Sequence, residues 1–296
     1  MTVPAAVATL LEGLVDYAGL FPPAALEMEQ AVACYARYRH AADHAMLGRF
    51  VLPAARIDAF VAAVDRLPHG APTPREPWAC AVLASAADAP AIAAVAARVG
   101  GCLRLDVIEA KASDVSEIEA IAAAFGPAVT VYVEVSAASD PAPLIAALAR
   151  HGLRAKLRTG GVTADAFPTP AEVLRFLVAC HASGVAFKAT AGLHHPLRGE
   201  YPLTYAPESP RATMYGFLNV FLAAAFLRAG VAAEAVAPLL EERDAGAIRA
   251  DADGITWRDW RLSRAALADV RRTGAASFGS CSFEEPSHEI TALAFV

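Results

Sequence analysis

Short runs rich in β-branched and apolar residues alternate along the chain with longer, alanine-rich amphipathic runs. The short runs predict strands at Leu14–Leu20, Met46–Leu52, Trp78–Ala84, Cys102–Ile108, Thr130–Ser136, Leu153–Thr159 and Val185–Ala191. The longer runs predict helices at about Leu26–Ala42, Ala55–Leu67, Ala89–Val99, Val115–Phe125, Pro141–His151 and Pro170–Ser183. This alternation indicates parallel strands joined by crossover helices, so we expect an α/β fold, a single-domain (β/α)8 TIM-type barrel over residues 1–296. A doubly wound open sheet is the alternative, but no G-x-G-x-x-G motif follows the first strand.

The eighth strand and the loops are harder to place. Ala247–Ala250 and Ile255–Arg258 flank an Asp253-Gly254 turn, and either is a candidate to close the barrel. Residues 193–210 form a long segment after the seventh strand and are expected to be a lid loop, and residues 275–296 are expected near the barrel mouth. Ser209 and Pro210 have the pattern of a helix start, which predicts a helix running to about Arg228. Pro68–Pro77 is a turn-rich loop.

Charged residues occupy the strand face that should point into the barrel. Since successive strand residues alternate faces, the apolar set should meet the helices and the polar set should point inward. The inward set comprises Asp16, Arg49, Arg104, Asp106, Tyr132, Glu134, Ser136, Arg154, Lys156, Arg158, Lys188 and Thr190. Burying an ion costs several kcal/mol, so this cluster favours a functional end of the barrel over a plug of salt bridges.

Composition and charge limit the classes of partner that the protein is expected to bind. The net charge is −6 without a basic run, which argues against nucleic acid, and the apolar stretch Phe217–Leu227 is too short to cross a bilayer. No secretory signal is evident, and the five cysteines are scattered, which fits the cytoplasm. We expect a small-molecule substrate, which the arginines indicate is anionic, and no cofactor. The sequence does not decide whether the chain forms a homo-oligomer.

Lysine is unusually rare. The 25 basic residues are 22 arginines and three lysines, at positions 111, 156 and 188. Lysine can lose its proton and act as an amine nucleophile, whereas arginine stays charged. Lys156 and Lys188 are therefore candidate catalytic residues, and direct repulsion between them would favour the neutral amine of one.

The segments after the sixth and seventh strands, and the C-terminal segment, supply further candidates. Gly160 and Gly161 follow a strand, where backbone N–H groups can approach an anion or simply make a turn. His194, His195 and Arg198 follow the seventh strand as acid–base, ligand or clamp residues. Ser280 and Ser282 are candidate binding residues beside Cys281, for which reactivity is the less favoured interpretation.

The two lysine segments resemble those of class I, Schiff-base aldolases of the deoxyribose-phosphate aldolase type. Lys156-Leu157-Arg158-Thr159-Gly160 is similar to that family's K-T-S-T-G, and Lys188-Ala189-Thr190-Ala191-Gly192 to its K-x-x-G-G. The resemblance implies that Lys156 forms the imine, that Lys188 keeps its pKa low and that Asp106 relays protons. Arg158 and Ala191 depart from the motifs, so the resemblance does not imply a sugar-phosphate substrate.

Three hypotheses follow. The first is a lyase that forms an imine with a small oxygenated or carboxylated carbonyl compound, with Lys156, Lys188, Asp106 and Glu134 as catalytic residues and Arg49, Arg158 and Arg198 as an anion clamp. The second is a divalent-metal enzyme with Glu134, His194 and His195 as ligands, aided by Asp16 or Asp106. The third is a barrel that binds a small molecule without catalysis.

Overall fold

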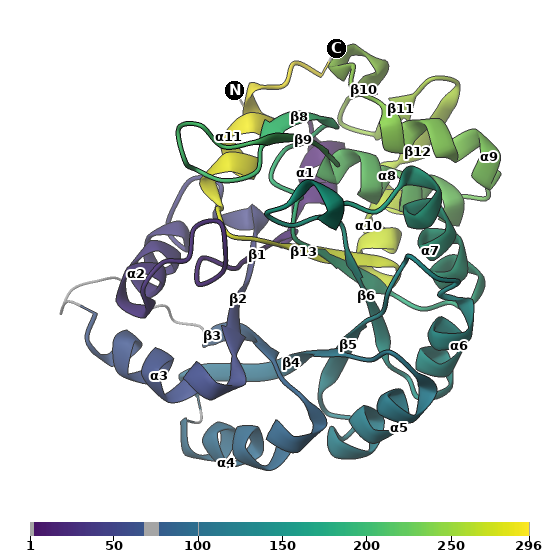
Figure 1. Ribbon diagram of the computed structural model, residues 1–296. Coiled ribbons are helices and arrows are strands. Elements are labelled where there is room, and N and C mark those ends of the chain that lie inside the picture. Colours follow the sequence, from purple (N-terminus) through teal and green to yellow (C-terminus); the bar gives the residue numbers. More distant parts are fainter. Residues whose placement is uncertain (1–2, 68–76, 100, 296) are drawn as a thin grey trace.

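Eight parallel strands close into a barrel in the computed structural model, which describes residues 3–67, 77–99 and 101–295 (Figure 1). Their order around the barrel is β1-β13-β7-β6-β5-β4-β3-β2. The barrel strands are β1 (Val15–Tyr17), β2 (Leu47–Pro53), β3 (Trp78–Leu83), β4 (Leu103–Lys111), β5 (Thr130–Glu134), β6 (Arg154–Arg158), β7 (Phe187–Thr190) and β13 (Ala275–Ser280). The predicted TIM-type barrel is confirmed, and the open-sheet alternative is wrong.

Helices form the outer layer of the barrel (Figure 1). They are α1 (Ala5–Leu11), α2 (Met28–Tyr38), α3 (Ile57–Asp65), α4 (Ala89–Val99), α5 (Val115–Ala124), α6 (Ala142–Arg150), α7 (Pro170–Ala182), α8 (Phe217–Arg228), α9 (Ala233–Val236), α10 (Arg264–Thr273) and α11 (Glu284–Ala292). Local sequence fixes several starts. For example, Thr169 and Glu172 form a reciprocal capping box around Pro170 at the first turn of α7.

The eighth barrel strand is β13, and both predicted candidates for it are wrong. β13 pairs with β1 and β7, whereas residues 248–263 form a separate antiparallel sheet of β10 (Ile248–Ala250), β11 (Gly254–Trp257) and β12 (Trp260–Ser263). The carboxylate of Asp251 accepts the backbone N–H groups of Asp253 and Gly254 and so closes a hairpin there. β13 consists mostly of small residues with weak strand propensity, and this hid it in the sequence.

The segment after β7 contains a hairpin. β8 (Gly199–Pro202) pairs antiparallel with β9 (Arg211–Met214), and α8 begins at Phe217, so the predicted helix start at Pro210 is wrong. The Ser209 hydroxyl accepts the backbone N–H of Thr204 at 2.8 Å, which closes the hairpin loop rather than capping a helix. The predicted loop Pro68–Pro77 lies, except for Pro77, outside the described residues.

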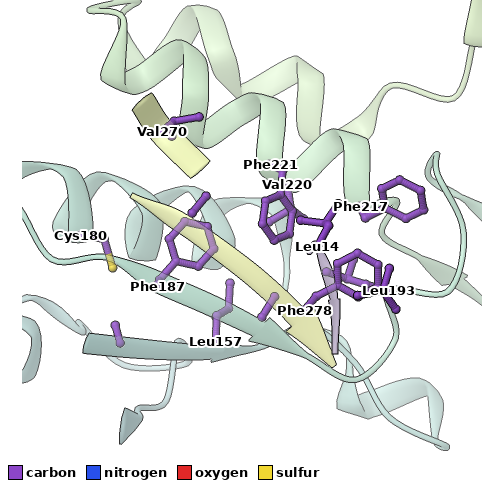
Figure 2. Close-up of a cluster of buried hydrophobic side chains, with 14 of the residues drawn as sticks. Leu14, Leu157, Cys180, Phe187, Leu193, Phe217, Val220, Phe221, Val270 and Phe278 are labelled. Carbon is purple, nitrogen blue, oxygen red and sulfur yellow. The ribbon is translucent and has the colours of Figure 1, made fainter. Parts of the chain in front are cut away.

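An aromatic layer joins the outer faces of β7 and β13 to α8 (Figure 2). The Phe217 and Phe278 rings stack at 5.3 Å, and Phe221 packs against Phe187 at 6.0 Å between centroids. α8 is buried on nearly all sides, which explains its almost continuous apolar sequence. Within the described ranges no helix is long and apolar enough to cross a membrane.

Candidate active site

Lys156 and Lys188 are buried side by side on neighbouring strands. They are in register on β6 and β7, so both side chains point into the barrel as the alternation predicted. Their side chains are 4% and 1% exposed. Two buried ammonium groups on adjacent strands repel each other strongly, so negative charge is needed beside them.

Glu109 supplies that charge from β4. Its Oε2 lies 2.9 Å from the Lys156 Nζ, and its Oε1 forms an ion pair with the Lys188 Nζ. Glu134 Oε2 lies 3.0 Å from the other side of the Lys156 ammonium, and Asp16 Oδ2 lies 2.6 Å from the Lys188 ammonium. The five side chains form one chain across the barrel, from Glu134 through Lys156, Glu109 and Lys188 to Asp16.

The ends of this chain are held in place. Asp16 also accepts the Ser277 hydroxyl at 2.7 Å and the backbone N–H of Arg49 at 2.6 Å. The Arg158 guanidinium donates to Glu134 at 3.0 Å. The buried chain therefore has two cations and three carboxylates, and the exposed Arg158 and Lys111, whose Nζ lies 3.7 Å from Glu134, supply further positive charge at its Glu134 end.

The pairing fixes the charge state of the central groups. Burial by itself raises the pKa of Glu109, but the ammonium groups of Lys188 and Lys156 outweigh it and hold the pKa at about 2. Burial likewise lowers the pKa of Lys188, but the carboxylates of Asp16 and Glu109 raise it above its ordinary value. Burial also raises the pKa of Glu134, and Lys156 and Arg158 bring it below the ordinary value. Because Glu109 lies between the lysines, it offsets the direct repulsion that the sequence suggested.

Sequence reasoning missed Glu109 and put Asp106 in its place. In the pairing of β3 with β4, Ala79 lies opposite Arg104 and Ala81 lies opposite Val107, so β4 has one residue more than β3 over this stretch. Such a bulge shifts the alternation, so Glu109 points inward at the site. Asp106 instead pairs with Arg49 at 2.6 Å, away from the lysines, and its side chain is 41% exposed. No local signal marked this position, because the strand runs on past Ile108 through Glu109, Ala110 and Lys111, residue types that are uncommon in strands, whereas the predicted strand ended at Ile108.

A cavity of about 340 Å³ opens above the chain at the carboxyl ends of the strands. Glu109 and Lys156 are among its lining residues, Arg158 and Thr190 line it further up, and Val51 and Leu83 add apolar surface. The volume suits a small organic molecule, and this end of a (β/α)8 barrel is where such enzymes commonly carry their sites. Glu134 faces a neighbouring hollow, which Arg158 also lines.

The predicted lid and the C-terminal segment both reach this mouth. Leu203, Thr204 and Tyr205 of the β8–β9 hairpin line the cavity, and so do Cys281 and Glu285. The Tyr205 hydroxyl donates to Glu285 at 2.9 Å and so ties the hairpin to α11.

Both predicted histidines lie at the mouth and pair with glutamates of α11. His194 Nδ1 lies 3.0 Å from Glu285, and His195 Nδ1 lies 2.8 Å from Glu289. The predicted serines are placed differently. Ser280 is buried with its hydroxyl 3.4 Å from His194 Nδ1, and the Ser282 hydroxyl accepts the backbone N–H of Glu285 at the start of α11. Neither serine lines the cavity.

The remaining candidates divide between packing and binding. Gly161 lines the cavity, whereas Gly160 is a packing residue, since a Cβ there would lie 2.4 Å from the Phe167 ring. Arg198 stacks on the Tyr215 ring at 4.6 Å and does not line the cavity. Arg49 lies at the opposite end of the barrel, so the expected clamp of three arginines is reduced to Arg158 at this mouth.

The ligand set expected for a metal enzyme is not assembled. Glu134 is bound by Lys156 and Arg158, and the two histidines face glutamates of α11 separately. Within residues 3–67, 77–99 and 101–295 no group of three His, Cys, Asp or Glu side chains is placed to hold a metal ion.

Comparison of the chain with family models, with curated proteins and with solved structures found no match. The function must therefore be argued from the site itself.

Proposed function

We propose that the protein is a carbon–carbon lyase in which Lys156 forms an imine with a small, anionic carbonyl compound. The observation that carries this proposal is the position of Lys156, which lines the mouth cavity and whose Nζ lies within 3.0 Å of two carboxylates. Imine formation requires an amine and a nearby group that can accept its proton, and here a buried amine has a carboxylate on either side.

Glu134 is the residue that takes the proton from Lys156. It touches the Lys156 ammonium directly, and its hollow connects it to solvent. The neutral amine then attacks the carbonyl carbon, and the carbonyl oxygen leaves as water after protonation. The resulting iminium withdraws electrons from the neighbouring carbon–carbon bond, which is what cleavage requires.

Glu109 and Lys188 are positioning residues in this proposal. Glu109 holds the Lys156 amine in place, and Lys188, fixed by Asp16, keeps Glu109 ionised. Arg158 is the group that meets the anionic part of the substrate, because its side chain is 46% exposed at the mouth.

The test is reductive trapping. The protein is incubated with a panel of small 2-oxo acids, hydroxyaldehydes and ketones in the presence of borohydride, and its intact mass is measured. The proposal expects one compound to add its mass less one oxygen atom to the wild-type protein and not to Lys156→Ala. A compound that is turned over without leaving such an adduct would exclude the imine.

A further inference from the structure

A second cavity, of about 510 Å³, opens at the amino ends of the barrel strands. Its walls include Arg49 near the start of β2, Arg104 near the start of β4 and Arg154 at the start of β6. Arg39, which follows α2, lines it as well. The Lys188 and Asp16 end of the buried charge chain also lines it, so this cavity lies on the far side of the chain from the mouth.

Positive charge dominates this cavity. Besides Arg39, its described lining carries four cationic side chains and one carboxylate, the cations being Arg49, Arg104, Arg154 and Lys188 and the carboxylate Asp16. Asp106, held by Arg49 at 2.6 Å and Arg104 at 3.5 Å, adds one more negative charge. Among these described groups, with Arg39 left out of the count, cations exceed carboxylates by two.

One of these cations, Arg154, has no carboxylate partner among the described residues. The Arg154 guanidinium donates to the Tyr132 hydroxyl at 2.9 Å and lies over that ring, and no described carboxylate is within ion-pair distance. Arg271 lies behind the cavity wall, donating to the carbonyls of Ala275 and Glu12 at 2.5 and 2.7 Å. Burial lowers the pKa of Arg271 to about 10, so it too is charged at neutral pH.

A concave, low-dielectric site of one charge sign concentrates ligands of the opposite sign. Guanidinium groups donate in pairs to phosphate and carboxylate oxygens. We propose that this amino-end cavity binds a small polyanion, such as a molecule bearing a pyrophosphate or several carboxylates. The proposal is independent of the imine, because the buried charge chain separates the two cavities.

Calorimetric titration of the full-length protein with inorganic pyrophosphate, and in parallel with citrate, tests this proposal. Arg154→Gln and Arg104→Gln each remove one cation from the cavity, and the Arg104 side chain is 55% exposed, so its replacement leaves the fold intact. Two controls remove the same charge elsewhere. Arg158→Gln changes the mouth cavity, and Arg98→Gln changes an exposed pair with Asp58 on the barrel surface.

At least one of the two polyanions should bind, and each cavity variant should raise its Kd about tenfold or more, as expected for a lost charge-assisted hydrogen bond. Both controls should stay within about twofold, as expected for distant sites. The probe that binds shows whether the cavity recognises phosphate groups or carboxylate groups. Binding of neither probe, equal binding by both cavity variants and the wild type, or loss of binding in Arg158→Gln would overturn the proposal. If Arg154→Gln does not fold, the Arg104→Gln result decides.

Discussion

Replacing Glu109 with glutamine removes the central negative charge of the buried chain while keeping its shape. Lys156 and Lys188 then face each other without the carboxylate that bridges them. The lysines lower the pKa of Glu109 from 4.5 to about 2, which corresponds to roughly 3 kcal/mol of stability at neutral pH. The same magnitude is found when one partner of a buried ion pair is removed, about 3–5 kcal/mol.

The pH dependence of this loss has a definite sign. A carboxyl with a lowered folded-state pKa stabilises the protein above its unfolded-state pKa, and the contribution disappears as the pH falls through the folded-state value. The stability difference between wild type and Glu109→Gln should therefore be complete at pH 7 and shrink to about 1 kcal/mol at pH 3. Urea unfolding at both pH values measures it, with Glu119→Gln on the exposed face of α5 as the matched control. A loss below about 0.5 kcal/mol at pH 7, or one that does not change with pH, would refute the reasoning.

Three further predictions concern other parts of the barrel. Gly160→Ala should cost about 1–3 kcal/mol in thermal unfolding because its Cβ would meet the Phe167 ring, and Phe167→Leu should restore part of that loss; full stability of Gly160→Ala alone would contradict the packing role. Iodoacetamide at pH 7 should label exposed Cys102 well before Cys281, because burial raises the pKa of the Cys281 thiol; preferential labelling of Cys281 by peptide mass would show a reactive thiol instead. Asn219→Ala should cost about 3 kcal/mol in urea unfolding, since the buried amide bonds three backbone groups that would lose their partner, whereas an unchanged midpoint would contradict this.

The sequence predicted the architecture because the signals for a parallel barrel are local. Alternation on β6 and β7 turned Lys156 and Lys188 inward, and Thr169 with Pro170 marked the start of α7. Each of these depends on residues a few positions apart. Such short-range patterns can be recognised in a single sequence.

The errors arose where distant contacts decide the outcome. The bulge in β4 is a matter of pairing with β3, and nothing near Glu109 in the sequence shows it. The strand β13 forms because its neighbours β1 and β7 need a partner, although its own residues favour strands weakly. The two lysines consequently lie side by side inside the barrel as predicted, whereas Asp106, which was expected beside them, lies at the opposite end.

The same error hid the fact that the barrel has separate cavities at its two ends. Sequence alternation gathered Arg49, Asp106 and Arg158 into a single cluster. In the structure Arg158 belongs to the mouth cavity, and Arg49 belongs to the opposite one. Position along a strand, which depends on barrel stagger, separates the two groups.

The identity of the lysine that carries the trapped substrate is the most direct test of the proposal that Lys156 is the nucleophile. Cleavage after glutamate places the three lysines on separate peptides, residues 110–117, 135–172 and 173–200, so mass analysis of the borohydride-reduced protein distinguishes them without ambiguity. We expect the adduct on residues 135–172, at Lys156, and we expect Lys188→Arg, which keeps the charge beside Glu109, to leave the adduct in the same place. An adduct on residues 173–200, or its persistence in Lys156→Arg, would contradict the assignment of Lys156 as the nucleophile.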